Sequence, residues 1–106
     1  MNKQIYQGDI PVLQIEKLDK ELEFRPLTEP IVVADGEISG HKHVLIAERE
    51  SICEIAQDQN GYYLNIKSGS AKITHPEHQT VVIDPGLYFI GRQWEFNEIE
   101  ERKVLD

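Results

Sequence analysis

The sequence predicts an all-β protein, a small antiparallel barrel or sandwich with at most one short helix. Short runs rich in valine, isoleucine, tyrosine and phenylalanine recur along the chain, and β-branched and aromatic side chains favour strands. Turn dipeptides separate these runs about every 8–12 residues, a spacing typical of barrels and sandwiches. The chain has 106 residues, a length that fits one domain over residues 1–106 with one hydrophobic core.

The expected strands are short and lie between turn residues. They are 10–15, 31–34, 41–47, 52–56, 62–67, 71–74, 80–83 and 87–96. Pro11 lacks a backbone N–H, so the first of these strands is expected at a sheet edge, where it could pair with a second copy of the chain in a homo-oligomer. Residues 16–23 could form one or two helical turns or a loop, since Leu18 and Leu22 lie four residues apart.

Glycine marks the expected turns between these strands. The pairs Asp35-Gly36 and Asn60-Gly61 offer the positive φ values that tight hairpin turns need. Ser68-Gly69 separates two strands by so few residues that the sequence predicts a hairpin there. Closely spaced turns of this kind favour antiparallel strands over a βαβ arrangement.

The charge of the chain argues against nucleic acid as its main partner. Its 11 Lys and Arg against 19 Asp and Glu give a net charge of −8, and such a surface repels phosphate backbones and anionic membranes. No apolar run approaches the ~20 residues of a membrane span, and residues 1–10 lack the features of a secretory signal. The lone cysteine, Cys53, excludes an intramolecular disulfide and shares a strand face with Ile55, which predicts burial. We therefore expect a cytoplasmic protein that does not bind membranes.

The histidines are the residues with the clearest chemical meaning. All 4 fall in two close-spaced pairs, His41 with His43 and His75 with His78. Side chains alternate across a strand, so His41 and His43 share a face, about 7 Å apart, and the second pair can close on one ion if its turn curls. Imidazole nitrogen suits zinc, nickel, copper and iron. The sequence thus predicts one divalent metal ion held by both pairs, zinc first, with nickel or iron as alternatives.

Part of the chain resembles the cupins. The first cupin motif carries a glycine, a His-x-His and then a glutamate, and Gly36, His41, His43 and Glu48 follow that order. In the second cupin motif a histidine follows a Pro-x-Gly turn, whereas in this chain no histidine follows Pro85-Gly86. The resemblance implies a cupin-like barrel with a metal among these residues, and a β-clip-like fold is the alternative for a barrel or sandwich of this size.

A second resemblance spans most of the chain. The motifs that carry it are Gly8-Asp9-Ile10, Ala34-Asp35-Gly36-Glu37, Gly40-His41-Lys42-His43, Thr74-His75-Pro76-Glu77-His78, Pro85-Gly86-Leu87-Tyr88 and Gln93-Trp94-Glu95-Phe96. This set is similar to a family of small, uncharacterised β proteins of bacteria and their phages. The resemblance implies a site built around the histidine pairs and supplies no reaction.

Three functions stay open on these residues. In a metal-dependent enzyme the ion would activate a bound water and Glu77, which lies between His75 and His78, would be the general base; the small-molecule substrate is unknown. In a non-catalytic module all four histidines would close the coordination shell. In a phage-associated interaction protein, the acidic surface would carry the function and the histidines would form a structural polar cluster.

Overall fold

Two antiparallel sheets pack face to face in the computed structural model of the chain, which describes residues 4–8, 10–18, 20–35 and 42–91. The strands are β1 (Gln4–Gln7), β2 (Ile10–Ile15), β3 (Arg25–Pro26), β4 (Ile31–Asp35), β5 (Lys42–Ala47), β6 (Ile52–Asp58), β7 (Gly61–Ser68), β8 (Ala71–Thr74), β9 (Val81–Ile83) and β10 (Gly86–Gly91). Sheet A has six strands in the order β1-β2-β10-β7-β6-β3, and sheet B has four in the order β4-β5-β8-β9. The predicted all-β class is confirmed, and the two sheets form a sandwich that does not close into a barrel.

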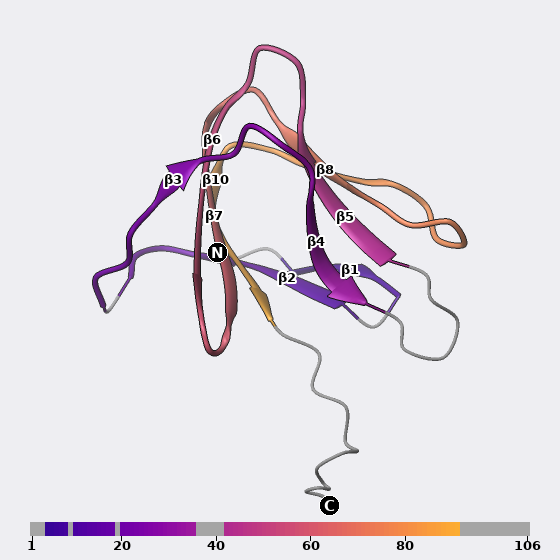
Figure 1. Cartoon of the computed structure of the whole chain (residues 1–106), viewed down its shortest axis with the longest axis horizontal. Helices are drawn as coiled ribbons and strands as arrows, with labels where there is room; N and C mark the ends of the chain where they lie inside the picture. The colour runs from indigo at the N-terminus through magenta and orange to yellow at the C-terminus, as the bar shows by residue number, and fades with distance from the viewer. Residues whose placement is uncertain (1–3, 9, 19, 36–41, 92–106) are drawn as a thin grey trace, which may run out of the picture.

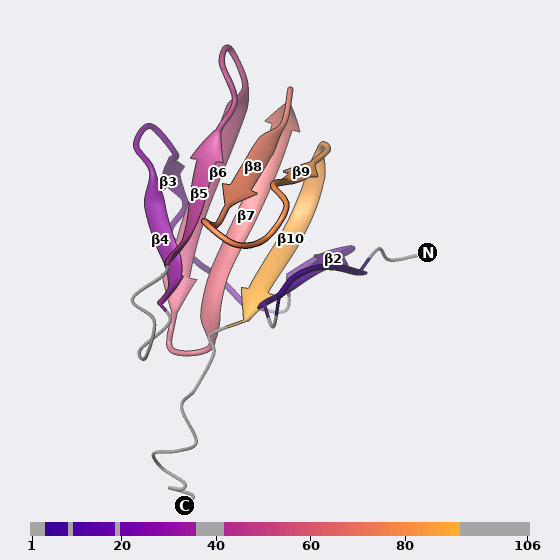
Figure 2. The same cartoon turned by 90° about the vertical axis from the view of Figure 1, so that its right-hand side faces the viewer.

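Sheet A bends where β2 meets β10. Figure 1 shows β6, β7 and β10 as one layer and β4, β5 and β8 as the other, while β2 crosses at a large angle to β7 and β10. In Figure 2, turned by 90°, sheet B lies in front of sheet A, and β2 again diverges from β10. The bend brings β1 into contact with β9, although β1 belongs to sheet A and β9 to sheet B. This contact positions the candidate site described below.

The core lies between the sheets and follows the period of two that strands impose. In β8, Ala71 and Ile73 are buried while the residues between and after them are half-buried. The buried hydrophobic cluster draws on both sheets and consists of Ile10, Val12, Leu27, Val33, Leu45, Cys53, Ile55, Leu64, Ile66, Ala71, Ile73, Ile83, Tyr88 and Ile90. The expected burial of Cys53 is confirmed, and this burial raises the pKa of its thiol.

Strand positions follow the sequence pattern closely. The expected strands 10–15 and 71–74 match the structure to the residue, and the other runs differ by one or two residues within the described part of the chain. His41 and residues 92–96, expected in strands, lie outside the described residues. The sequence pattern missed β1 and β3, because β1 is short with a glutamine at each end and β3 has only two residues, both exposed.

The segment 16–23 is a loop throughout its described part, so of the two expected alternatives the loop is correct. Eight residues are too few for their own hydrogen bonds to offset the cost of starting a helix. Across the residues that the structure describes there is no helix at all, and hence none long and apolar enough to cross a membrane.

The expectation that Pro11 marks a sheet edge is wrong. β2 lies between β1 and β10, and its pairing with β10 begins at Val12. Pro11 is opposite Tyr6 of β1, so the missing N–H falls one residue outside the β10 pairing. The outermost strands of the two sheets are β1 and β3, and β4 and β9, so β2 does not offer a free edge to a second copy.

The expected hairpin at Ser68-Gly69 is also wrong, because β7 belongs to sheet A and β8 to sheet B. The link crosses from one sheet to the other, with Gly69 at φ 82°. The connection from β5 to β6 crosses at the same end, and the two are bonded together: the Ser70 N–H donates to Ser51 Oγ at 2.8 Å, and the Glu48 N–H donates to the Ser70 carbonyl at 2.9 Å. We call this pair of crossings, residues 48–51 and 68–70, the crossover corner.

Candidate functional site

Three of the four histidines come together at the end of the sandwich opposite the crossover corner. His43 lies on β5 with its side chain on the same inner face as Leu45, and it is 8% exposed. His75 and His78 lie in the connection from β8 to β9, half-buried and exposed respectively. The ring centroids are 4.3 Å apart for His43 and His75, 4.5 Å for His75 and His78, and 6.1 Å for His43 and His78. These spacings put the rings at the corners of a triangle. His41 lies outside the described residues.

Strand register explains why residues so far apart in sequence meet. β5 and β8 are antiparallel neighbours, and their pairing begins with Val44 opposite Thr74. One step further along each strand stand His43 and His75, so the same register sets them opposite each other. His78 follows within the same turn. His43 of the first predicted pair therefore meets both members of the second pair.

A buried glutamine that the sequence analysis missed supports His43. Gln7, at the end of β1, is only 2% exposed. Its Nε2 donates to the carbonyl oxygens of Ile73 at 2.7 Å and Gln79 at 2.8 Å, and its Oε1 is 2.8 Å from Nδ1 of His43. Glutamine is seldom fully buried, and nothing in the local pattern around Gln7 indicates this position. The bend of sheet A, which brings β1 against sheet B, creates it.

Gly8 makes room for His78. Its φ is +60°, a conformation that favours glycine, and a Cβ added there would lie 2.6 Å from Nε2 of His78. A side chain at this position would therefore push the imidazole away. The motif Gly8-Asp9-Ile10 was part of the second resemblance, so the sequence did hold a signal here.

A hydrogen bond from the backbone to a histidine side chain closes the turn that carries His75 and His78. The N–H of Glu77 donates to Nδ1 of His75 at 3.0 Å, and Glu77 is exposed. A backbone N–H can only donate, so this bond requires a lone pair on Nδ1 of His75. The role of Glu77 as general base stays a prediction.

Glu48, which the cupin resemblance would add to the metal ligands, is not near the histidines. It follows the far end of β5 at the crossover corner and its carboxylate lies 4.0 Å from Lys72 Nζ. Five residues of extended strand separate it from His43, roughly 16 Å. Glu48 as a ligand of the same ion is therefore wrong.

The spacing of the three rings can be tested against a metal ion. Imidazole nitrogens bind zinc at about 2.0–2.1 Å in tetrahedral geometry, which sets the ring centroids roughly 5 Å apart. The observed spacings of 4.3, 4.5 and 6.1 Å lie on either side of that value. Among the described residues, however, no group of three or more His, Cys, Asp or Glu is arranged to hold an ion as it stands. The rings are close enough for a shared ion, and their nitrogens would have to turn toward it.

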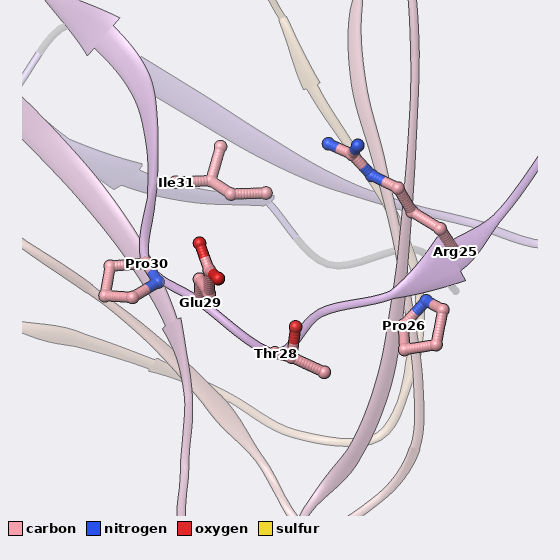
Figure 3. A pocket seen from close by; sticks show the side chains of 6 residues that line it. All are labelled: Arg25, Pro26, Thr28, Glu29, Pro30 and Ile31. Carbon is pink, nitrogen blue, oxygen red and sulfur yellow. The ribbon is translucent and has the colours of Figure 1, made fainter.

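A surface pocket away from the histidines is a weaker candidate for a binding site. It has a volume of about 250 Å³ and lies along the connection from β3 to β4. Figure 3 shows its lining residues, which are Arg25, Pro26, Thr28, Glu29, Pro30 and Ile31. All but Ile31 are exposed, so it holds no buried polar group that would fix a ligand.

Fold and site together define a two-sheet β-sandwich protein with a histidine cluster at one end of the sandwich. The chain belongs to the family described as Domain of unknown function (DUF8820), whose model matches residues 6–93. The match includes Gln7, Gly8 and all four histidines, and it confirms the expectation of an uncharacterised family. Neither the curated proteins nor the solved structures contain a match to the chain.

Proposed function

We propose that this chain binds one divalent transition-metal ion through its histidines, with zinc as the first candidate and nickel or iron as alternatives. The observation that carries the proposal is the triangle of His43, His75 and His78, with centroid spacings of 4.3 to 6.1 Å. Neutral imidazole nitrogen is a common ligand for these ions. His41, two residues before His43 on the same strand pattern, is the proposed fourth ligand.

The burial of the three rings suits an ion that enters from solvent. His43 is buried on the inner face of sheet B, whereas His75 and His78 lie on a turn that water reaches. The strand would hold the first imidazole rigidly, and the turn would bring the other two onto the ion. If one coordination position stays open, a bound metal would lower the pKa of a water molecule there, and Glu77 is the residue to take its proton.

Metal titration of the intact chain tests this proposal. After treatment with a chelator, the wild-type chain should bind one Zn²⁺ ion per chain in isothermal titration calorimetry. His75→Gln and His78→Gln should each lower the affinity for zinc at least tenfold. Replacing a residue that only hydrogen-bonds to a metal ligand already costs roughly 10–100-fold in affinity, and replacing the ligand itself should cost no less.

Glu77→Gln is the matched control in the same turn, and its affinity should stay within about twofold of wild type if only the histidines bind the ion. The proposal would be contradicted if the chain bound neither zinc, nickel nor iron. It would also be contradicted if both histidine variants bound zinc as tightly as the wild-type chain.

A second candidate is a phage-associated interaction protein in which the histidines are a structural polar cluster. The hydrogen bonds of Gln7 favour it, because they tie β1 to sheet B without any ion. Its test is the melting temperature. A purely structural cluster predicts the same melting temperature with and without chelator, whereas a bound ion adds stability that the chelator removes. The cytoplasmic location and the acidic surface as an interaction surface stay predictions from composition.

Gly8→Ala should weaken metal binding with only a small loss of stability. A Cβ at this position would displace His78, whose exposed ring can swing away, so the cost in unfolding free energy is about 1–2 kcal/mol, mostly from the positive φ. The displaced ring should lower zinc affinity about tenfold or more. Urea unfolding and zinc titration of the same samples separate the two effects. Affinity equal to wild type would mean that His78 is not a ligand.

A further inference from the structure

We infer that Gln7 and the Glu77 backbone hold His43 and His75 in opposite tautomers, so that a neutral His43 carries its lone pair on Nε2 whereas His75 must give up a hydrogen bond before it joins an ion. The tautomers follow from hydrogen bonds of the described residues. Their meaning for metal binding rests on the proposed function.

The orientation of the Gln7 amide is fixed by its surroundings. Its Nε2 lies between two carbonyl oxygens, those of Ile73 at 2.7 Å and Gln79 at 2.8 Å. Reversing the amide would set an oxygen against both of these oxygens, three acceptors without a hydrogen among them. The amide oxygen must therefore be the atom that faces His43.

That orientation decides where the hydrogen of His43 lies. The Gln7 Oε1 can only accept, and it is 2.8 Å from Nδ1 of His43 in a buried setting. Nδ1 must therefore carry the hydrogen, and in the neutral ring the lone pair is then on Nε2. This is the tautomer in which a histidine binds a metal through Nε2 while its other nitrogen donates to a supporting group. Gln7 is thus a positioning residue for His43.

His75 is held the other way round. The N–H of Glu77 donates to its Nδ1 at 3.0 Å, so in the neutral ring the hydrogen is on Nε2. Such a ring cannot offer Nε2 to an ion without moving its hydrogen, and its Nδ1 lone pair is taken up by the turn. His75 joins an ion only when it gives up the bond from Glu77. The exposed turn thus acts as a latch on the site, which explains why the rings lie within reach of one another and yet form no ready-made metal site.

Nitrogen NMR of the whole, metal-free chain tests the inference directly. Long-range ¹H–¹⁵N spectra of uniformly ¹⁵N-labelled protein, at a pH where imidazoles are neutral, distinguish the two ring nitrogens. We expect the hydrogen on Nδ1 in His43 and on Nε2 in His75, with signals assigned from the His41→Gln, His75→Gln and His78→Gln variants. A hydrogen on Nε2 of His43, or on Nδ1 of His75, would overturn the inference.

A variant of Gln7 tests the cause. Gln7→Met keeps the length of the side chain but removes its amide, and His43 should then show a mixture of both tautomers. Gln57→Met, on the exposed face of β6, is the control and should leave the spectrum unchanged. A pure Nδ1–H tautomer in folded Gln7→Met would show that another group sets it. If Gln7→Met does not fold, the wild-type spectrum alone decides the tautomers.

Addition of Zn²⁺ to the wild-type sample separates this inference from the proposed function. We expect His43 to keep its hydrogen on Nδ1 while the pattern of His75 changes. Zinc binding that leaves the His75 pattern unaltered would overturn the latch. The expected tautomers with no response of any histidine to zinc would uphold the roles of Gln7 and the Glu77 N–H and reject the proposed function instead.

Discussion

Gly69→Ala is expected to lower the free energy of unfolding by about 2–5 kcal/mol, a large fraction of the 5–15 kcal/mol typical of a whole domain. Gly69 has φ 82°, where an alanine is strained, and its new Cβ would lie 2.1 Å from Ser51 Oγ and 2.8 Å from Ser51 Cα. The Cα cannot move without shifting the other chain crossing of the corner. Both crossings between the sheets would thus be disturbed by one methyl group.

Urea unfolding followed by circular dichroism measures this loss. Gly91→Ala is the matched control, because a Cβ there meets nothing closer than 3.5 Å, and its cost should be under about 1 kcal/mol. Adding Ser51→Gly to Gly69→Ala removes the contacts with Oγ and Cβ and should restore part of the stability, while the strain at φ 82° stays. If the free energy of unfolding of Gly69→Ala is within about 0.5 kcal/mol of the wild-type value, the crossover corner is not packed as described.

The sequence predicts the strands well because their signal is local. Alternation with a period of two and turn residues at the ends are properties of each short segment, so 10–15 and 71–74 could be placed to the residue. Which strand pairs with which is a property of the whole chain. Ser68-Gly69 reads as a hairpin by its length alone, yet β7 and β8 lie in different sheets.

In the candidate site, too, the local features could be predicted from the sequence and the features that depend on strand pairing could not. The histidine pairs stand out in the sequence. His43 and His75 come together because β5 pairs directly with β8, although β6 and β7 lie between these strands in the sequence. That pairing could not be read from spacing, whereas the distance between Glu48 and His43 follows from the extended length of β5 alone. Gln7 could not be found at all, because its burial depends on the bend of sheet A and its partners lie 36 to 72 residues away in sequence.

Gln7→Met should lower the free energy of unfolding by about 2–4 kcal/mol. The substitution fills the same space but leaves the Ile73 carbonyl without its buried donor and Nδ1 of His43 without its acceptor. The Gln79 carbonyl, in a partly buried bond, can turn to water and should cost less. Urea unfolding measures the loss, and Gln57→Met on the exposed face of β6 should change it by less than about 0.5 kcal/mol.

A double-mutant cycle then isolates the bond between Gln7 and His43. His43→Met alone leaves the Gln7 oxygen without its donor, and Gln7→Met alone leaves Nδ1 of His43 without its acceptor, so each single variant carries a penalty for a broken buried hydrogen bond. The double variant has neither group, and it should be less destabilised than the sum of the two by about 1 kcal/mol or more. The double variant still carries the cost at the Ile73 and Gln79 carbonyls, which lose the Gln7 donor. Additive losses would mean that the 2.8 Å contact couples the two side chains weakly, and then Gln7 would stabilise the join of β1 to sheet B without controlling the histidine.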